Sequence, residues 1–138
     1  MMQNLKIYFN NTRVRNAKTV NISVTQTKPN IRFDRNQDDL YTIIMVDPDA
    51  PYPNDPKFKY FLHWFVVNNT EELMNYTPPN PPSDSDNHRY CVFVYKQEAK
   101  IYPDMFYSLG RKNFNLMKFE ELFYVTKIAS GYFITGYK

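Results

Sequence analysis

Three segments of the chain, residues 41–47, 61–68 and 89–97, are almost continuously apolar and carry many Val, Ile, Tyr and Phe residues. β-Branched and aromatic residues favour extended strands, and each run is shorter than a typical buried helix. A strand that is apolar at nearly every position has to bury both of its faces. We therefore predict that these three segments are adjacent central strands of one sheet.

Loops rich in proline and asparagine separate these segments. Residues 49–59 hold Pro51, Pro53 and Pro56, and residues 77–87 hold four prolines followed by Ser-Asp-Ser-Asp. Proline has no backbone N–H to donate, so neither stretch can continue a sheet. Both are predicted to be rigid, exposed connections at the ends of the central strands.

Shorter patterns complete the predicted fold. Alternating apolar and polar residues indicate half-buried strands, and two windows have a plausible helix cap, Thr70 and Asn113. Together they predict a mainly β (all-β) protein, an antiparallel β-sandwich with a large central sheet, a smaller second sheet and one or two short helices, in a single domain over residues 1–138. The additional strands are expected at residues 5–9, 20–24, 30–33 and 132–135, and the helices at residues 70–75 and 113–124.

Composition argues against several classes of protein. No run approaches the roughly 18 uninterrupted apolar residues that a membrane-spanning helix needs, and the N-terminus lacks the apolar core of a secretory signal. The single cysteine, Cys91, cannot form an internal disulfide and fits a reducing compartment. These features predict a non-secreted, cytoplasmic protein without a transmembrane segment.

Basic residues gather in the first quarter of the chain. Residues 1–35 carry seven Lys or Arg and one acidic residue, Asp34. Such a segment could contact an anionic lipid surface or nucleic acid. The cations are scattered among strand and turn positions, without the helix or aromatic platform of nucleic-acid readers. We expect no nucleic-acid partner, and peripheral membrane contact is left open.

The two histidines and two aspartates are the best candidates for a site. His63 and His88 both fall at central strands, and Asp47 and Asp49 lie where another one ends. Two His and a carboxylate could hold a metal, or the histidines could be buried for structural reasons. If instead an Asp keeps a neighbouring imidazole protonated, that ring donates a hydrogen bond to an anion. Asp47 and Asp49, two apart in an extended chain, are expected to share one face, which favours a small anion pocket.

Other common catalytic layouts are absent from the sequence. Glycine occurs only at positions 110, 131 and 136, so there is no glycine-rich phosphate loop. There is also no Gly-x-Ser-x-Gly elbow and no His-Glu-x-x-His motif. No cofactor is therefore expected.

Three separated motifs occur in order, with suitable gaps: Asp47-Pro-Asp-Ala-Pro51, then His63 ahead of Phe65-Val-Val-Asn68, then Pro81-Pro82 with His88-Arg-Tyr90. In these motifs the chain resembles the phosphatidylethanolamine-binding protein family, which includes Raf kinase inhibitor protein and plant flowering regulators. The resemblance implies a β-sandwich of that type, with a surface cavity for phosphate or a phospholipid head group. It also implies a cis peptide bond between Ala50 and Pro51.

The resemblance also assigns the site. In the roles it implies, the histidines donate to the anion, the aspartates orient the imidazoles, Tyr90 is a pocket wall with a hydroxyl, and the prolines form rims. The chain departs from the family pattern at Phe58, where many relatives have tyrosine, and at Asn80, where they have glycine. By motif position, the cavity residues are Asp47, Asp49, Pro51, His63, Pro81, His88 and Tyr90.

The predicted function is non-enzymatic binding of a phosphate-bearing small molecule or phospholipid head group, which would suit a signalling regulator. No catalytic or metal-binding residues are assigned. An alternative is a protein-interaction inhibitor of a kinase or protease that uses the same face. A further alternative is a metal-dependent hydrolase built on the His and Asp residues.

Overall fold

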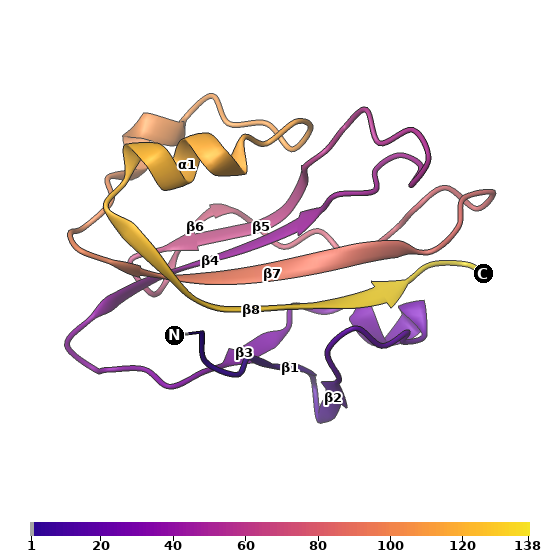
Figure 1. Ribbon diagram of the computed structural model, residues 1–138, viewed down its shortest axis with the longest axis horizontal. Coiled ribbons are helices and arrows are strands. Elements are labelled where there is room, and N and C mark those ends of the chain that lie inside the picture. Colours follow the sequence, from indigo (N-terminus) through magenta and orange to yellow (C-terminus); the bar gives the residue numbers. More distant parts are fainter. Residues whose placement is uncertain (1) are drawn as a thin grey trace.

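The computed structural model describes residues 2–138, which form two antiparallel sheets with one α-helix and two short 3₁₀ helices (Figure 1). The smaller sheet has the order β2-β1-β3, and the larger has the order β6-β5-β4-β7-β8. In chain order the elements are β1 (Lys6–Phe9), β2 (Thr12–Val14), η1 (Ile22–Thr25), β3 (Asn30–Arg32), β4 (Leu40–Asp47), β5 (Phe61–Val67), β6 (Glu71–Met74), β7 (His88–Gln97), η2 (Pro103–Phe106), α1 (Leu116–Leu122) and β8 (Val125–Thr135).

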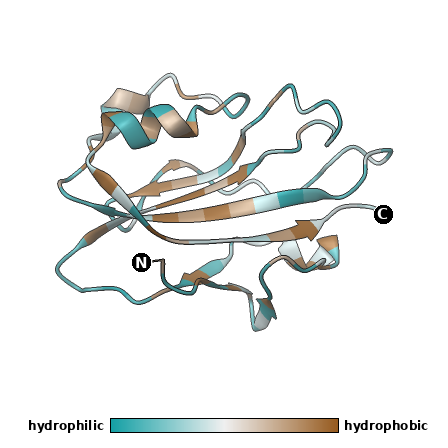
Figure 2. Ribbon diagram, viewed as in Figure 1, coloured by the Kyte–Doolittle hydropathy of each residue, from teal (hydrophilic) through white to brown (hydrophobic). Residues whose placement is uncertain are grey.

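The three apolar segments are the adjacent strands β5, β4 and β7 of the larger sheet, as the sequence predicts. Nearly every residue of β4 and β5 is buried, because both faces of the sheet are covered. Figure 2 shows apolar residues concentrated along these central strands and polar residues in most connecting loops. The mainly β, antiparallel fold is therefore confirmed.

The central sheet lies between two different layers (Figure 1). The small sheet packs on one face, where Ile7, Phe9 and Ile31 meet Met45 and other residues of the central strands. The helical layer packs on the opposite face, where side chains of α1 and the preceding loop meet residues from β4 and β5. Within residues 2–138, no helix is both long enough and apolar enough to span a bilayer.

Two predicted elements are wrong. Residues 20–24, predicted as a strand, contain instead the start of the 3₁₀ helix η1, because the Asn21 side chain accepts the N–H of Ser23 and turns the chain. Residues 70–75, predicted as a helical turn, contain the edge strand β6, which pairs with β5. Asn68 and Asn69 have φ values of 53° and 70°, a conformation that asparagine tolerates and that closes a tight hairpin.

Other boundaries differ in detail. The helix expected at residues 113–124 is shorter, and it is capped by Asn115, whose side chain accepts the N–H of Lys118. The last strand is longer than residues 132–135, because β8 pairs along the whole of β7. Strand β2 was not predicted, since Thr12–Val14 is too short to show an alternating pattern.

Candidate functional site

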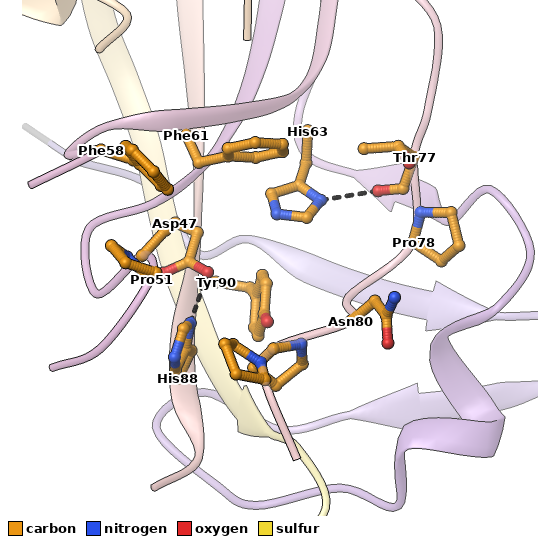
Figure 3. Close-up of a pocket in the computed structure, with 13 residues that line it drawn as sticks. Asp47, Pro51, Phe58, Phe61, His63, Thr77, Pro78, Asn80, His88 and Tyr90 are labelled. Atoms are coloured by element: carbon orange, nitrogen blue, oxygen red, sulfur yellow. Dashed lines mark hydrogen bonds and ion pairs between the residues drawn. The ribbon is translucent and has the colours of Figure 1, made fainter. Parts of the chain in front are cut away.

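A cavity of about 270 Å³ lies at one end of the central sheet. Both neighbours of β4 run antiparallel to it, so the end of β4 meets the beginnings of β5 and β7. Asp47 ends β4, His88 begins β7 and His63 is near the start of β5. Residues of the two proline loops complete the wall (Figure 3). The lining residues are Asp47, Ala50, Pro51, Phe58, Phe61, His63, Thr77, Pro78, Asn80, Pro81, Pro82, His88 and Tyr90.

A β-bulge aims His63 at this cavity. In the pairing of β4 with β5, Met45 is opposite Trp64 and Val46 is opposite Leu62, so His63 is the extra residue between two paired positions. Leu62 consequently packs on the helical side of the sheet, and Trp64 packs on the small-sheet side. His63 meets Tyr90, whose ring also belongs to the small-sheet side, with ring centroids 5.2 Å apart. Bulges often re-aim side chains in this way beside functional sites.

Asp47 and His88 form a buried pair. The Asp47 Oδ2 atom lies 2.7 Å from His88 Nδ1, and their side chains are only 4% and 1% exposed. The other carboxylate oxygen of Asp47 accepts the backbone N–H of Asp49 at 2.7 Å. The expected role of Asp47 in orienting an imidazole therefore matches its position.

Both ring nitrogens of His88 are engaged by the protein. Its Nε2 atom lies 2.9 Å from the Ser85 hydroxyl, whose single proton is donated to the carbonyl oxygen of Asp86 at 2.7 Å. Nδ1 faces the Asp47 carboxylate, so contacts on both sides of the ring fix its orientation. His88 lines the cavity, and since both ring nitrogens already have a protein partner, its role as a donor to a ligand stays a prediction.

Within residues 2–138, only one of the two ring nitrogens of His63 has a hydrogen-bond partner. Its Nδ1 atom lies 2.7 Å from the carbonyl oxygen of Thr77, and since a carbonyl only accepts, Nδ1 carries a proton. Burial lowers the pKa of His63 below its ordinary value, although the Thr77 hydrogen bond and the Asp47 carboxylate act in the opposite direction. The lowered pKa favours the neutral ring at pH 7, and the imidazolium expected from the sequence stays a prediction for His63. The second ring nitrogen, Nε2, points toward the cavity (Figure 3).

Tyr90 brings an unpaired hydroxyl to the cavity. Its side chain is fully buried, its ring lies between His88 and Asn80 in Figure 3, and it stacks on Phe133 at 5.6 Å. Among residues 2–138, its hydroxyl has no hydrogen-bond partner. Burial raises the pKa of Tyr90, and the charge and hydrogen-bonding tendency of the nearby Asp47 carboxylate raise it further, so the hydroxyl keeps its proton as a donor. Asp47 is close to the hydroxyl but does not reach hydrogen-bond geometry. A buried donor without an acceptor is costly, and a ligand acceptor would relieve this cost.

Replacing Tyr90 tests this assignment. Tyr90→Phe removes an unpaired polar group from the ligand-free protein, so we expect the free energy of unfolding to rise by about 1 kcal/mol. Binding of an anion that accepts the hydroxyl proton should weaken by about 1.5–3 kcal/mol. Urea unfolding and calorimetric titration with phosphate measure the two effects. A loss of stability above about 1 kcal/mol would instead reveal a buried partner for the hydroxyl.

Two lysines lie at the cavity wall formed by Phe58. The Lys112 Nζ atom is 4.2 Å from the centroid of the Phe58 ring, and the Lys57 Nζ atom is 5.7 Å from it. Both lysines are exposed, so they can attract an anion toward the cavity. The neighbouring wall residue, Pro51, follows a cis peptide bond with Ala50, as the resemblance implies.

Asn80 and Pro81 lie on the opposite wall, in the loop between β6 and β7. The Asn80 side-chain oxygen accepts the hydroxyl proton of Tyr137 at 2.6 Å. That bond holds Asn80 against the segment that follows β8. The residue thus adds bulk to the wall, and its carbonyl oxygen already has a partner.

Asp49 does not line the cavity. Its carboxylate accepts the backbone N–H of Arg89 at 2.8 Å and two guanidinium N–H groups of the same residue, at 3.0 and 2.8 Å. Burial acts to raise the pKa of Asp49, but the hydrogen bonds and charge of Arg89 hold it below its ordinary value. The alternation argument fails here because β4 ends at Asp47. Asp49 fixes the start of β7, and it makes no hydrogen bond to either imidazole.

Sequence reasoning missed several supporting residues. Arg111 donates to the carbonyl oxygens of Leu62, His63 and Asn75, and so ties the bulged start of β5 to the loop after β6. Ser85 holds His88. The Ser-Asp-Ser-Asp stretch at residues 83–86 was a usable signal for Ser85, three residues before His88, whereas no local pattern marks Arg111.

A family model described as "Phosphatidylethanolamine-binding protein" matches residues 9–73 and 67–132. A phosphatidylethanolamine-binding protein homolog of Acanthamoeba polyphaga mimivirus is 38% identical over 141 residues, which cover 98% of this chain and 99% of that protein. Protein MOTHER of FT and TFL1 homolog 2 of Oryza sativa subsp. japonica is 36% identical over 115 residues, which cover 77% of this chain. That match spans only 65% of the rice protein's length.

Solved structures show the same fold. A carboxypeptidase Y inhibitor complexed with its cognate proteinase matches with a TM-score of 0.78 and 24% identity, over 99% of this chain and 84% of that one. A phosphatidylethanolamine-binding protein from Plasmodium vivax matches with a TM-score of 0.77 and 16% identity, over 97% of this chain and 85% of that one. At these identities the likeness concerns the fold.

Proposed function

The chain belongs to the phosphatidylethanolamine-binding protein family, and from that premise we propose that its cavity binds a small phosphate-bearing anion, such as a phospholipid head group, without catalysing a reaction. The observation that carries this proposal is the buried Tyr90 hydroxyl, which has no partner among the described residues. A phosphate oxygen is a strong acceptor for such a donor.

The size and charge of the cavity support a small ligand. A volume of about 270 Å³ is at the lower end of the range for small-molecule sites. The lysines beside Phe58 give the surface near the cavity a positive charge. A head group suits this arrangement, with its phosphate inside and the rest of the lipid outside.

Binding of a phosphate oxygen to His63 requires a proton between the two groups. The free Nε2 of His63 is an acceptor at pH 7, so it can bind a phosphate oxygen only if a proton lies between the two atoms. A singly protonated phosphate can bring that proton. A fully deprotonated anion cannot, and His63 then has to take up a proton from solution.

Calorimetric titration of the protein with inorganic phosphate and with phosphorylethanolamine tests the proposed function. Saturable binding at one site, lost or weakened in Tyr90→Phe and retained in Lys118→Ala on α1, would support the cavity as the site. No heat of binding up to millimolar concentrations of either compound would contradict the proposal.

Because of this required proton, the affinity of the cavity for sulfate should depend on pH. Sulfate stays fully deprotonated between pH 5.5 and about pH 8, so only His63 can supply its proton. Because the pKa of His63 is lowered by burial, the imidazolium fraction grows as pH falls through this window, and sulfate affinity should rise by up to about tenfold per pH unit. Competition between sulfate and a bound fluorescent phosphate ester measures the sulfate affinity at each pH. In His63→Gln the slope should vanish, and an unchanged slope would exclude His63 as its source.

The departure from the family pattern at Phe58 gives another prediction. Phe58→Tyr adds a hydroxyl at the cavity wall, where it can donate to a bound phosphate. We expect phosphate affinity to rise by about 0.5–1.5 kcal/mol, the net value of one hydrogen bond. Phe58→Leu, which keeps an apolar wall without a hydroxyl, is the control in the same titration. Equal affinities in the three proteins would place the ligand away from this wall.

A second candidate function is inhibition of a protease. It is favoured by the likeness of the whole chain to the carboxypeptidase Y inhibitor. Hydrolysis by carboxypeptidase Y in the presence of increasing protein tests it directly, and saturable inhibition would support it. A protein kinase partner and a cytoplasmic location stay predictions. In the part of the chain that the structure describes, no three His, Cys, Asp or Glu side chains are grouped as a metal site, and we propose no hydrolase.

A further inference from the structure

The outer face of the small sheet carries a row of cations. In β1, Ile7 and Phe9 point into the core, so by alternation Lys6 and Tyr8 face outward. The same argument turns Arg13 of β2 and Arg32 of β3 outward, because Val14 and Ile31 are buried. The strand pairing places Lys6 directly opposite Arg32 and Tyr8 directly opposite Arg13. This face lies on the side of the small sheet away from the central sheet (Figure 1).

The row is extended by Arg15, which follows β2 and is exposed. Ile7 pairs with Val14, the last residue of β2, and Arg15 is the next residue along the chain. Lys6 and Arg32 lie side by side on neighbouring strands, whose backbones are about 5 Å apart. We call Lys6, Arg13, Arg15 and Arg32 the basic face.

Acidic side chains of the described residues do not neutralise the cations of the basic face. Within residues 2–138, none of its four cations forms an ion pair. Arg32 donates to the Asn30 side chain and lies 4.2 Å from the Tyr8 ring centroid, both uncharged partners. Like charges directly opposite each other on neighbouring strands destabilise a sheet. An arrangement that is unfavourable in the isolated protein is explained if an external anion covers it.

From this face we propose that the small sheet docks on an anionic lipid bilayer. The charges have one sign, are exposed and are spread over a broad sheet face, which matches a surface of anionic head groups. Protein interfaces generally combine both signs of charge in a complementary pattern. Single-stranded nucleic acid needs free aromatic rings for stacking, whereas the Arg32 guanidinium lies over Tyr8.

The position of the cavity fits this docking. Tyr90 packs on the side of the central sheet that the small sheet covers, and none of the lining residues belongs to β1, β2 or β3. The basic face and the cavity are therefore separate surfaces on the same side of the central sheet. The choice of a lipid surface rests on the proposed function, since a bilayer would supply the phosphate-bearing head group.

Co-sedimentation with vesicles tests the proposal. We expect wild-type protein to bind vesicles of phosphatidylcholine with added phosphatidylserine, more weakly as salt is raised, and to bind pure phosphatidylcholine poorly. Lys6→Gln with Arg32→Gln should weaken binding to the anionic vesicles by at least about tenfold. This double variant removes a repulsive pair, so thermal unfolding should show no loss of stability. The control, Lys100→Gln with Lys118→Gln, makes the same change in charge away from the small sheet and should bind like wild type.

Equal binding to both kinds of vesicle, or equal losses in the two double variants, would overturn the proposal. Binding of an acidic protein or RNA through Lys6 and Arg32 without vesicle binding would overturn it as well. Titration of the same variants with soluble phosphorylethanolamine separates the two proposals. If vesicle binding depends on the basic face and phosphorylethanolamine does not bind, the docking proposal stands and the proposed anion binding in the cavity is rejected. If phosphorylethanolamine binds and vesicle binding does not depend on the basic face, the proposed anion binding in the cavity stands and the docking proposal is rejected.

Discussion

Asp47→Ala is expected to lower the free energy of unfolding by about 3–5 kcal/mol, because it leaves the buried partners of the Asp47 carboxylate without an acceptor. The Asp47 and His88 side chains are 4% and 1% exposed and 2.7 Å apart, so water cannot replace the lost carboxylate. The substitution also removes the acceptor of the Asp49 N–H. The remaining imidazole is then buried with one nitrogen bonded to Ser85 and the other without its carboxylate partner.

Urea unfolding at pH 7 measures this loss, and Asp39→Ala is the matched control. Asp39 pairs with Lys96 at 3.7 Å, where both side chains are partly exposed. Pairs of this kind contribute about 0–1 kcal/mol. If the two aspartate variants lost similar amounts of stability, the Asp47–His88 pair would not be the electrostatic centre of the cavity.

The central strands could be predicted from sequence because their composition reflects burial directly. A strand covered on both faces has to be apolar at nearly every position, and that signal survives in residues 41–47, 61–68 and 89–97. The strands at the edge of the sheet do not show this continuous apolar pattern. Strand β6 is only half-buried and carries Glu71 and Glu72, so its place in the sheet depends on the Asn68-Asn69 turn and on pairing with β5.

The candidate site was predicted in outline, and its hydrogen bonding was not. The topology brings Asp47, His63 and His88 together, as their positions in the strands suggested. Strict alternation along β5 would have put His63 on the same side as Phe65, and only the bulge reverses it. A bulge arises from the pairing of two strands, so neither strand shows it alone. The partner of Asp49 is Arg89, which is distant in sequence and is brought close by the pairing of β4 with β7.

The helical layer should be as important for stability as the cavity pair. Phe65 of β5 is fully buried, and its ring meets the rings of Phe106, Phe114 and Phe119 at centroid distances of 5.3, 5.5 and 5.4 Å. All three partners come from the segment around η2 and α1. Phe65→Ala is therefore expected to lower the free energy of unfolding by about 3–5 kcal/mol, through lost burial and the cavity left behind.

The matched control is Tyr107→Ala, which removes an aromatic ring that is 91% exposed in the same segment and should change stability by about 0.5 kcal/mol or less. Because Phe65 packs on the helical side and Tyr90 on the small-sheet side of the central sheet, folded Phe65→Ala should bind phosphate with wild-type affinity. A loss of stability below about 1 kcal/mol would mean that the helical layer is not part of the core. A loss of phosphate binding in the folded variant would mean that the two faces of the sheet are coupled, and the cavity could then respond to whatever contacts α1.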